Sequence, residues 1–147
     1  TEKELGKNLI DRLKRLTSLR LELNKRSIKA PIHVWGGLDP LITPLYFFAG
    51  ADMFDGVSWL RYSYHDGVAV NRESYPVLSG SLTLSKDHSI ALAINENLRV
   101  LQGIATSLRS FASSNTPNFD MFASKGNFFE KAYKAMRANI PEMEELS

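Results

Sequence analysis

The sequence predicts an α/β fold built around two parallel strands. Two short apolar runs of strand length, residues 32–35 and 53–59, flank a compact helical segment that Gly50 ends. A strand, a helix and a second strand over this distance form a βαβ unit, whose strands run parallel and are joined by a right-handed crossover. We therefore expect both strands to end at the same edge of one sheet. In α/β proteins that edge binds ligands and holds catalytic side chains.

A long amphipathic helix precedes this unit. Leucines recur every three or four residues from Leu5 to Leu23, and Thr1 with Glu4 forms a capping-box pattern, which together predict a helix over residues 1–24. Residues 1–30 hold nine Lys/Arg against four Asp/Glu, whereas the remaining residues hold nine against twelve. This basic helix is compatible with binding along phosphates and equally with a solvated outer face.

The crossover helix has two possible starts, Asp39-Pro40 and Thr43-Pro44. A helix that began at Pro40 would hold Pro44 in its interior at a cost of about 3 kcal/mol. The sequence therefore favours a helix over residues 44–49 with Thr43 as its cap.

The second half of the chain changes from short strands to helices. Residues 68–70 and 75–78 predict a small irregular hairpin, and helical periodicity returns over residues 89–110. Thr116-Pro117 predicts the start of a last helical region, which Gly126 divides.

Composition restricts the class of protein and of site. The chain has 147 residues, 44% hydrophobic and 23% charged, without a signal-peptide layout or an apolar run of the roughly 20 residues that cross a bilayer. We expect a cytoplasmic protein without membrane contact. The absence of cysteine excludes disulfides and thiolate zinc sites. His33, His65 and His88 show no metal-ligand spacing, so no metal and no cofactor are expected.

One motif resembles a known family. Residues 50–55 read Gly-Ala-Asp-Met-Phe-Asp, with the Gly36-Gly37 turn and Pro40 before them and Arg61 after them. This pattern resembles the tRNA-guanine transglycosylase superfamily, which includes queuine and archaeosine tRNA-ribosyltransferases. Within this superfamily the chain is most similar to the DNA-modifying 7-deazaguanine branch. The similar segments are His-Val-Trp-Gly-Gly-Leu-Asp-Pro and Gly-Val-Ser-Trp-Leu-Arg-Tyr, and the chain lacks the zinc-binding cysteines of the tRNA-modifying members. The resemblance covers residues 31–67 and, more loosely, 89–110.

The resemblance implies the end of a (β/α)8 TIM barrel, with residues 32–35 as the seventh strand and 53–57 as the eighth. Two parallel strands cannot stand alone, a closed barrel takes about 250 residues, and the chain opens with Thr. We therefore expect residues 1–147 to be the C-terminal part of a larger barrel. Residues 1–88 would hold its last units and the small hairpin, and 89–147 its C-terminal helices. The remainder would lie upstream or on a partner chain.

The resemblance also implies a pentosyltransferase that replaces guanine by a 7-deazaguanine of the preQ0 type in nucleic acid, DNA rather than tRNA. Asp55 would be the nucleophile and would form a covalent glycosyl-aspartate intermediate. The general acid/base and the base-reading groups would lie outside this chain. The resemblance also places Trp35, Gly36 and Gly37 at the base and Arg61 near the nucleic-acid backbone. Tyr62 and Tyr64 could stack on unpaired bases, although Tyr64 stands where the family has a second arginine.

Alternatives remain for these residues and for the function. Asp55 could cap the turn that follows it, and Gly36 with Gly37 could form only a tight turn. Asp52 should point away from Asp55, because the two are three residues apart on one strand. The alternative functions are a tRNA-guanine transglycosylase, or a catalytically silent homologous subunit that acts as a nucleic-acid-binding module. An unrelated barrel hydrolase would explain Asp55 but not the surrounding motif.

Overall fold

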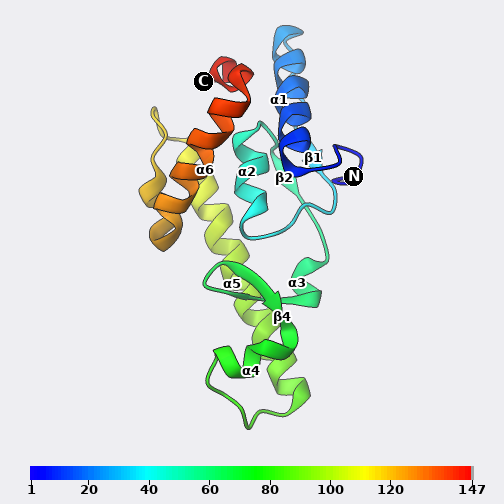
Figure 1. The fold of residues 1–147 in the computed structure, drawn as a ribbon, viewed down its shortest axis with the longest axis vertical. Helices are drawn as coiled ribbons and strands as arrows, with labels where there is room; N and C mark the ends of the chain where they lie inside the picture. Colours follow the sequence, from blue (N-terminus) through cyan, green and yellow to red (C-terminus); the bar gives the residue numbers. More distant parts are fainter. Residues whose placement is uncertain (147) are drawn as a thin grey trace.

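A computed structural model describes residues 1–146, which form a mostly helical molecule with two small sheets (Figure 1). The elements in chain order are α1 (Leu9–Lys25), β1 (His33–Val34), α2 (Ile42–Phe48), β2 (Met53–Phe54), α3 (Ser58–Arg61), β3 (Tyr62–His65), β4 (Val68–Asn71), η1 (Arg72–Ser74), α4 (Tyr75–Leu78), α5 (Lys86–Ala112), η2 (Phe119–Lys125), α6 (Gly126–Asn139) and η3 (Pro141–Leu146). Across these residues no helix is long and apolar enough to span a membrane.

The predicted parallel pair is confirmed. β1 and β2 run parallel, with His33 opposite Met53 and Val34 opposite Phe54, and α2 is the helix between them. The N–H groups of Asp52 and Met53 both donate to the Ile32 carbonyl, at 2.9 and 3.1 Å, and extend the pairing toward the start of the strands. Both strands are shorter than predicted.

The predicted TIM-barrel segment is wrong. Within residues 1–146 no third strand joins β1 and β2, and the only other sheet is the antiparallel pair β3–β4. The physical reason is that helices of this chain cover the parallel pair. Ile32 and Val34 belong to one buried cluster with residues of α1, α2, α5, α6 and η3, so the two strands complete a mainly helical core.

The predicted hairpin is also misplaced. β3 and β4 pair Tyr62 with Asn71 and His65 with Val68, whereas Tyr75–Leu78 is the short helix α4. The turn residues explain the pairing: Asp66 and Gly67 have φ of 48° and 70°, and two consecutive positive φ values suit a two-residue hairpin turn. Asp-Gly between two apolar segments is the signal that predicts this turn.

The helix starts differ from their predicted caps. α1 begins at Leu9, because the Asn8 side chain accepts the Asp11 N–H at 2.9 Å. Thr1 and Glu4 do contact each other, but they close a turn ahead of the helix.

α2 begins at Ile42, and Thr43 is not its cap. The Asp39 carboxylate accepts the N–H groups of Leu41 and Ile42 at 2.9 and 3.1 Å, while the Thr43 hydroxyl donates to the Gly37 carbonyl. Pro44 is the third helical residue. Its missing N–H causes no loss there, since the first four N–H groups of a helix have no intrahelical partner.

The main core lies where α2 meets the C-terminal helices. Figure 1 shows α2 between α1 and α6, with α5 behind them. The Phe48 ring of α2 is surrounded by aromatic rings at centroid distances of 5.0–6.3 Å, and several meet it edge to face, a favourable geometry. These rings belong to Phe111, Phe119, Phe122, Phe129 and Tyr133. The predicted C-terminal helices are confirmed, with α5 slightly longer than expected and α6 beginning at Gly126.

The elements α3, β3, β4 and α4 pack around the first half of α5, at the end of the molecule opposite the two termini (Figure 1). Asn97 of α5 is fully buried and binds this part to the helix. Its amide nitrogen donates to the carbonyls of Trp59 and Tyr62 at 2.6 and 2.8 Å, and its oxygen accepts the Tyr64 N–H at 2.6 Å. One side chain thus satisfies three backbone groups.

Candidate functional site

The candidate site lies at the carboxyl end of the parallel pair. Because Val34 is opposite Phe54, the residues that follow the two strands, Trp35 and Asp55, leave the sheet side by side. Two groups on the β1 side contact the Asp55 carboxylate. Its Oδ1 accepts the Gly36 N–H at 2.9 Å, and its Oδ2 lies 3.2 Å from His33 Nε2. Asp55 is therefore oriented at the sheet edge where sequence reasoning places it.

His33 is the site residue that sequence reasoning missed. The strand register explains its position: His33 is opposite Met53, so Asp55 is its diagonal neighbour on the same face, within reach of a long side chain. The His33 ring also packs on Trp35, with centroids 4.7 Å apart and planes tilted by 32°. A signal was available, since His33 and Trp35 are two residues apart on one strand and must share a face.

Gly36 and Gly37 have different roles. Gly36 has φ of 81°, a value that favours glycine, and a Cβ built on it would meet nothing within 4 Å. Its conformation aims its N–H at Asp55 and leaves open space beside it. Gly37 is buried, and a Cβ there would lie 2.7 Å from Val34 Cγ1 and 3.1 Å from the Tyr46 ring. Close packing therefore explains Gly37, whereas Gly36 forms part of the site.

The site is an open shelf. The Asp55 side chain is 44% exposed and Trp35 is 59% exposed, while the His33 side chain beneath them is 28% exposed. A partner molecule can reach the carboxylate and the indole without any movement of the chain. Within the described part of the chain no group of three or more His, Asp or Glu side chains is arranged to hold a metal ion.

Asp52 lies away from this shelf, as the strand alternation predicts. Its Oδ2 accepts the Ile32 N–H at 2.7 Å and forms an ion pair with Arg20 of α1. Arg20 also donates to the Gly50 carbonyl at 3.0 Å. Asp52 therefore fastens the start of β2 to β1 and α1, which is a structural role.

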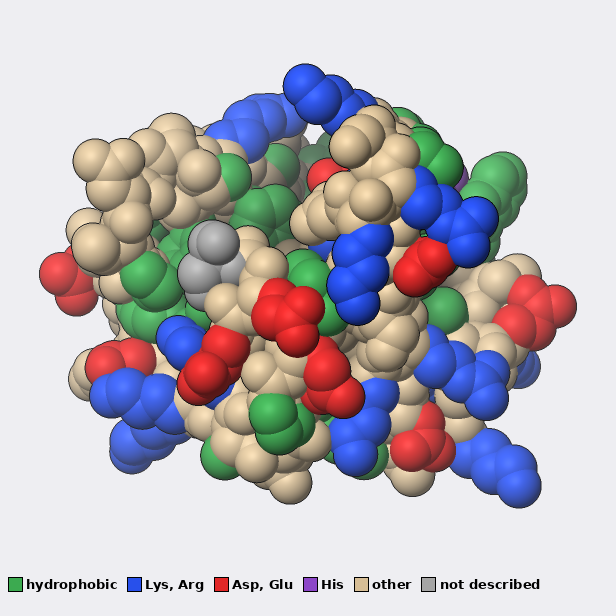
Figure 2. Space-filling model, turned by 90° about the horizontal axis from the view of Figure 1, so that it is seen from above, with side chains coloured by type: hydrophobic (Ala, Val, Ile, Leu, Met, Phe, Trp, Pro, Cys, Tyr) green, Lys and Arg blue, Asp and Glu red, His purple; other side chains and the backbone are tan. Residues whose placement is uncertain are grey.

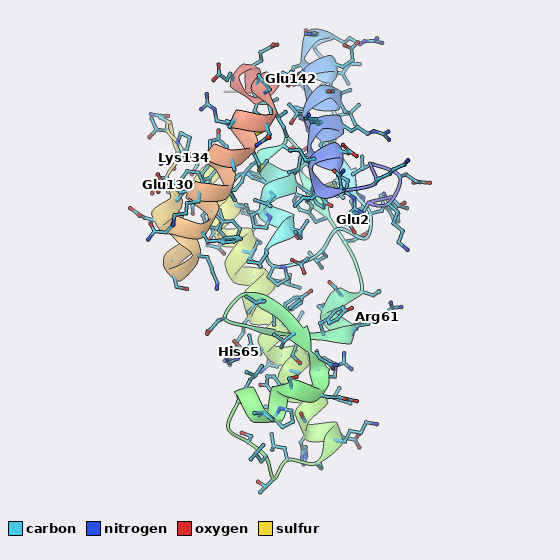
Figure 3. The ribbon with its side chains drawn as sticks, in the orientation of Figure 1. Glu2, Arg61, His65, Glu130, Lys134 and Glu142 are labelled. Atoms are coloured by element: carbon cyan, nitrogen blue, oxygen red, sulfur yellow. The ribbon has the colours of Figure 1, made fainter. Side chains whose placement is uncertain are left out.

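The three residues predicted to bind nucleic acid do not form one surface. Arg61 is exposed on α3, and Figure 3 shows it pointing away from α5, on the opposite side of this part of the molecule from His65. Tyr62, next to it, is 47% exposed.

The prediction for Tyr64 is wrong, because its ring is fully buried and cannot stack on a base. Its hydroxyl lies 2.7 Å from Ser58 Oγ and donates to the Leu38 carbonyl at 3.2 Å. Burial raises the pKa of Tyr64, which the hydrogen bond to Ser58 partly opposes. Period-two alternation cannot detect this burial, because Ser63 and Tyr64 are consecutive and both buried.

The N-terminal segment supports the β1 side of the shelf. The Glu2 N–H donates to the Trp35 carbonyl at 2.9 Å, and its carboxylate accepts the Tyr46 hydroxyl at 2.6 Å and Arg12 Nη1 at 2.8 Å. Burial, followed by the hydrogen bond to Glu2, raises the pKa of Tyr46 to about 12. The pKa of Arg12 is raised as well, mainly through its hydrogen bond with Tyr46.

The charged side chains at the end of the molecule that carries the last turns of α1 and η3 are mixed in sign. Figure 2 shows acidic and basic groups interspersed over this surface. A single basic field along α1 is therefore not visible from this side.

The shelf is thus defined by Asp55, His33, Gly36 and Trp35. Arg61 and Tyr62 follow it in the chain, on α3 and β3. Comparisons of the chain with protein-family models, with curated proteins and with solved structures found no match.

Proposed function

We propose that this chain carries the nucleophile of a base-exchanging transglycosylase, which replaces guanine by a 7-deazaguanine of the preQ0 type in nucleic acid. The observation that carries the proposal is the position of Asp55 at the carboxyl end of β2. There it is accessible and oriented through both oxygens, beside an exposed indole and an open glycine. The motif of residues 50–55, similar to that of the guanine transglycosylases, supports the same reading.

The reaction needs one carboxylate that acts twice. An Asp55 oxygen attacks C1′ of the target nucleotide, the C1′–N9 bond breaks, and its electron pair leaves on guanine, which takes a proton from a general acid. The sugar is then an ester of Asp55. The incoming 7-deazaguanine loses its N9 proton to a base, its N9 attacks C1′, and the C1′–O bond breaks to restore the carboxylate. Two inversions retain the configuration at C1′.

The reaction needs groups that the open shelf does not contain. A general acid/base and a pocket that reads guanine and excludes water are needed. We assign both to protein outside these 147 residues, either a further segment or a partner chain. The reaction needs no cofactor, since the carboxylate provides the covalent step. We place it in the cytoplasm.

DNA is the proposed polymer. A target base must leave its stack to bring C1′ to Asp55, which costs a few kcal/mol in a duplex. Trp35, exposed beside the carboxylate, offers a face for stacking of the displaced base, and Arg61 and Tyr62 offer a guanidinium and a second ring for the strand. The missing cysteine zinc site supports the same choice by resemblance.

The test is the variant Asp55→Asn in the full-length protein with its partner chain, assayed with guanine-containing DNA and with tRNA. A covalent protein–nucleic acid adduct on a denaturing gel should form with wild type and disappear in Asp55→Asn, while nucleic-acid binding persists. Asp52→Asn is the matched control, because it makes the same change on the same strand but on the other side, and should keep the adduct. An undiminished adduct in Asp55→Asn would remove Asp55 from the mechanism, and exchange into tRNA alone would reverse the choice of polymer.

A second candidate is a catalytically silent subunit that binds nucleic acid. The Asp55 carboxylate is exposed, and within the described residues it accepts one hydrogen bond, from the Gly36 N–H, and contacts His33 Nε2. This open position favours the silent subunit. In that case wild type and Asp55→Asn would bind DNA equally, and neither would form an adduct.

A further inference from the structure

We infer that His33 is a positioning residue for Asp55, holding its carboxylate in the orientation from which it attacks. This inference rests on the proposed function. His33 is not among the site residues predicted from the sequence. The observation is that two groups from β1 and its end contact the two oxygens of one carboxylate at the end of the neighbouring strand. His33 Nε2 lies 3.2 Å from Oδ2, and the Gly36 N–H donates a hydrogen bond to Oδ1 at 2.9 Å.

The fold supplies this arrangement through register. The parallel pair is only two residues long, so few backbone hydrogen bonds fix the chain at Asp55 itself. The carboxylate is nearly half exposed, and an exposed side chain samples several rotamers unless two or more contacts restrict it. His33 restricts it more than a long flexible cation would, because its own ring is held against Trp35.

A role for His33 as the general acid is excluded by distance. In a retaining displacement the nucleophile and the acid act on opposite faces of the sugar ring, and the corresponding groups of retaining glycosidases are about 5–5.5 Å apart. His33 Nε2 is 3.2 Å from Asp55 Oδ2, on the nucleophile's own side. It can orient the carboxylate, but a sugar cannot lie between the two groups.

Trp35 links this contact to the substrate. Its indole packs on His33 through one side and is 59% exposed. A base that stacks on Trp35 would press on the ring that holds Asp55. Occupation of the base position and orientation of the nucleophile are then coupled through a single stack of rings.

The test compares His33→Gln with His33→Met, two side chains of similar length. Both lose the ring that packs on Trp35, but only Gln keeps an N–H group near the position of Nε2, so their difference isolates the polar contact with Asp55. The first readout needs no activity: hydrogen exchange of the Gly36 amide in the 147-residue chain. Asp55→Ala supplies the exchange rate of that amide without its acceptor.

We expect His33→Met to accelerate Gly36 exchange about five- to tenfold, toward the Asp55→Ala rate, because a less ordered Asp55 carboxylate weakens the one hydrogen bond that it accepts from the Gly36 N–H. His33→Gln, which keeps an N–H group but loses the ring packed on Trp35, should lie between wild type and His33→Met. In the full-length protein at saturating DNA, single-turnover adduct formation should slow by a similar factor in His33→Met and recover in part in His33→Gln.

The outcomes separate the two proposals. If wild type forms no adduct, the proposed function fails, and Gly36 exchange still decides whether His33 holds Asp55. Suppose that wild type forms the adduct, and that His33→Met has the same Gly36 exchange rate and the same rate of adduct formation as wild type. The inference about His33 would then be overturned, while the proposed function would stand. Equal losses in His33→Gln and His33→Met would overturn it too, because the ring and not its N–H would then be responsible.

Discussion

Asn97→Ala should separate the α3–β4 part of the molecule from α5. Asn97 is fully buried, and its amide satisfies the carbonyls of Trp59 and Tyr62 and the N–H of Tyr64. Truncation to alanine leaves one buried and two partly buried backbone groups without their partner. Each such group costs about 1–3 kcal/mol, and water that enters the vacated space recovers part of this, so we expect a loss of about 3–6 kcal/mol in the free energy of unfolding.

Urea unfolding followed by circular dichroism measures this loss. For a slope of about 2 kcal/mol per molar urea, the midpoint should fall by about 1.5–3 M. Asn95→Ala is the matched control, since Asn95 lies on the exposed side of the same helix. Its effect should stay within about 0.5 kcal/mol of wild type. Hydrogen exchange at the Tyr64 amide should accelerate in Asn97→Ala but not in Asn95→Ala. A difference between the two variants below about 1 kcal/mol would refute the reasoning.

Two further predictions concern the supports of the strand pair. Tyr46→Phe removes a buried hydroxyl whose pKa is raised to about 12, so in wild type the folded state holds that proton more tightly than the unfolded state. Wild-type stability should therefore fall as the pH rises from about 10 to about 12. This fall should be shallower in Tyr46→Phe, as thermal melts at several pH values would measure; parallel pH profiles would contradict the assignment. Asp52→Ala leaves the Ile32 N–H without its acceptor and Arg20 without its ion-pair partner, and should lower the free energy of unfolding by about 1–3 kcal/mol in a urea titration. Adduct formation at saturating nucleic acid should persist in Asp52→Ala, and its loss in a folded variant would show that Asp52 acts in the reaction.

The parallel pair and the position of Asp55 were predictable because they depend on local patterns. The local pattern predicts a βαβ unit, because a short helix that ends at a glycine separates two apolar runs. The strands of such a unit are parallel, so both end at the same edge of the sheet. The separation of Asp52 from Asp55 follows from strand alternation alone. These features need no knowledge of the rest of the chain.

The barrel prediction was wrong because it extended a resemblance over residues 31–67, together with the argument that two parallel strands cannot stand alone, to helices whose packing it did not consider. Periodicity describes which face of α5 or α6 is apolar, but it does not identify the surface that this face covers. Here the apolar faces of α5 and α6 pack on α2, where Phe111 and Phe129 contact Phe48.

The contacts of His33 and Asn97 depend on tertiary structure, and this limits what a sequence can reveal about them. Asn97 sits mid-helix, where an Asn ordinarily faces solvent, and its partners lie more than thirty residues earlier in the chain. Strand alternation places His33 and Trp35 on one face, but the contact of His33 with Asp55 can be seen only once the register of β1 and β2 is known. The start of α2 was mispredicted for a related reason, because Pro44 is unfavourable in a helix interior but neutral in the first turn.

The aromatic cage around Phe48 has a consequence for how the molecule folds. The crossover helix is complete at residue 48, yet the rings that enclose it come from residues 111–133. Contacts of such long sequence separation slow folding, because the intervening loop must close before they form. During synthesis the strands that carry His33 and Asp55 leave the ribosome well before their packing partners. The shelf should therefore be among the last features to become ordered, and a nascent chain stopped before Phe111 should lack it.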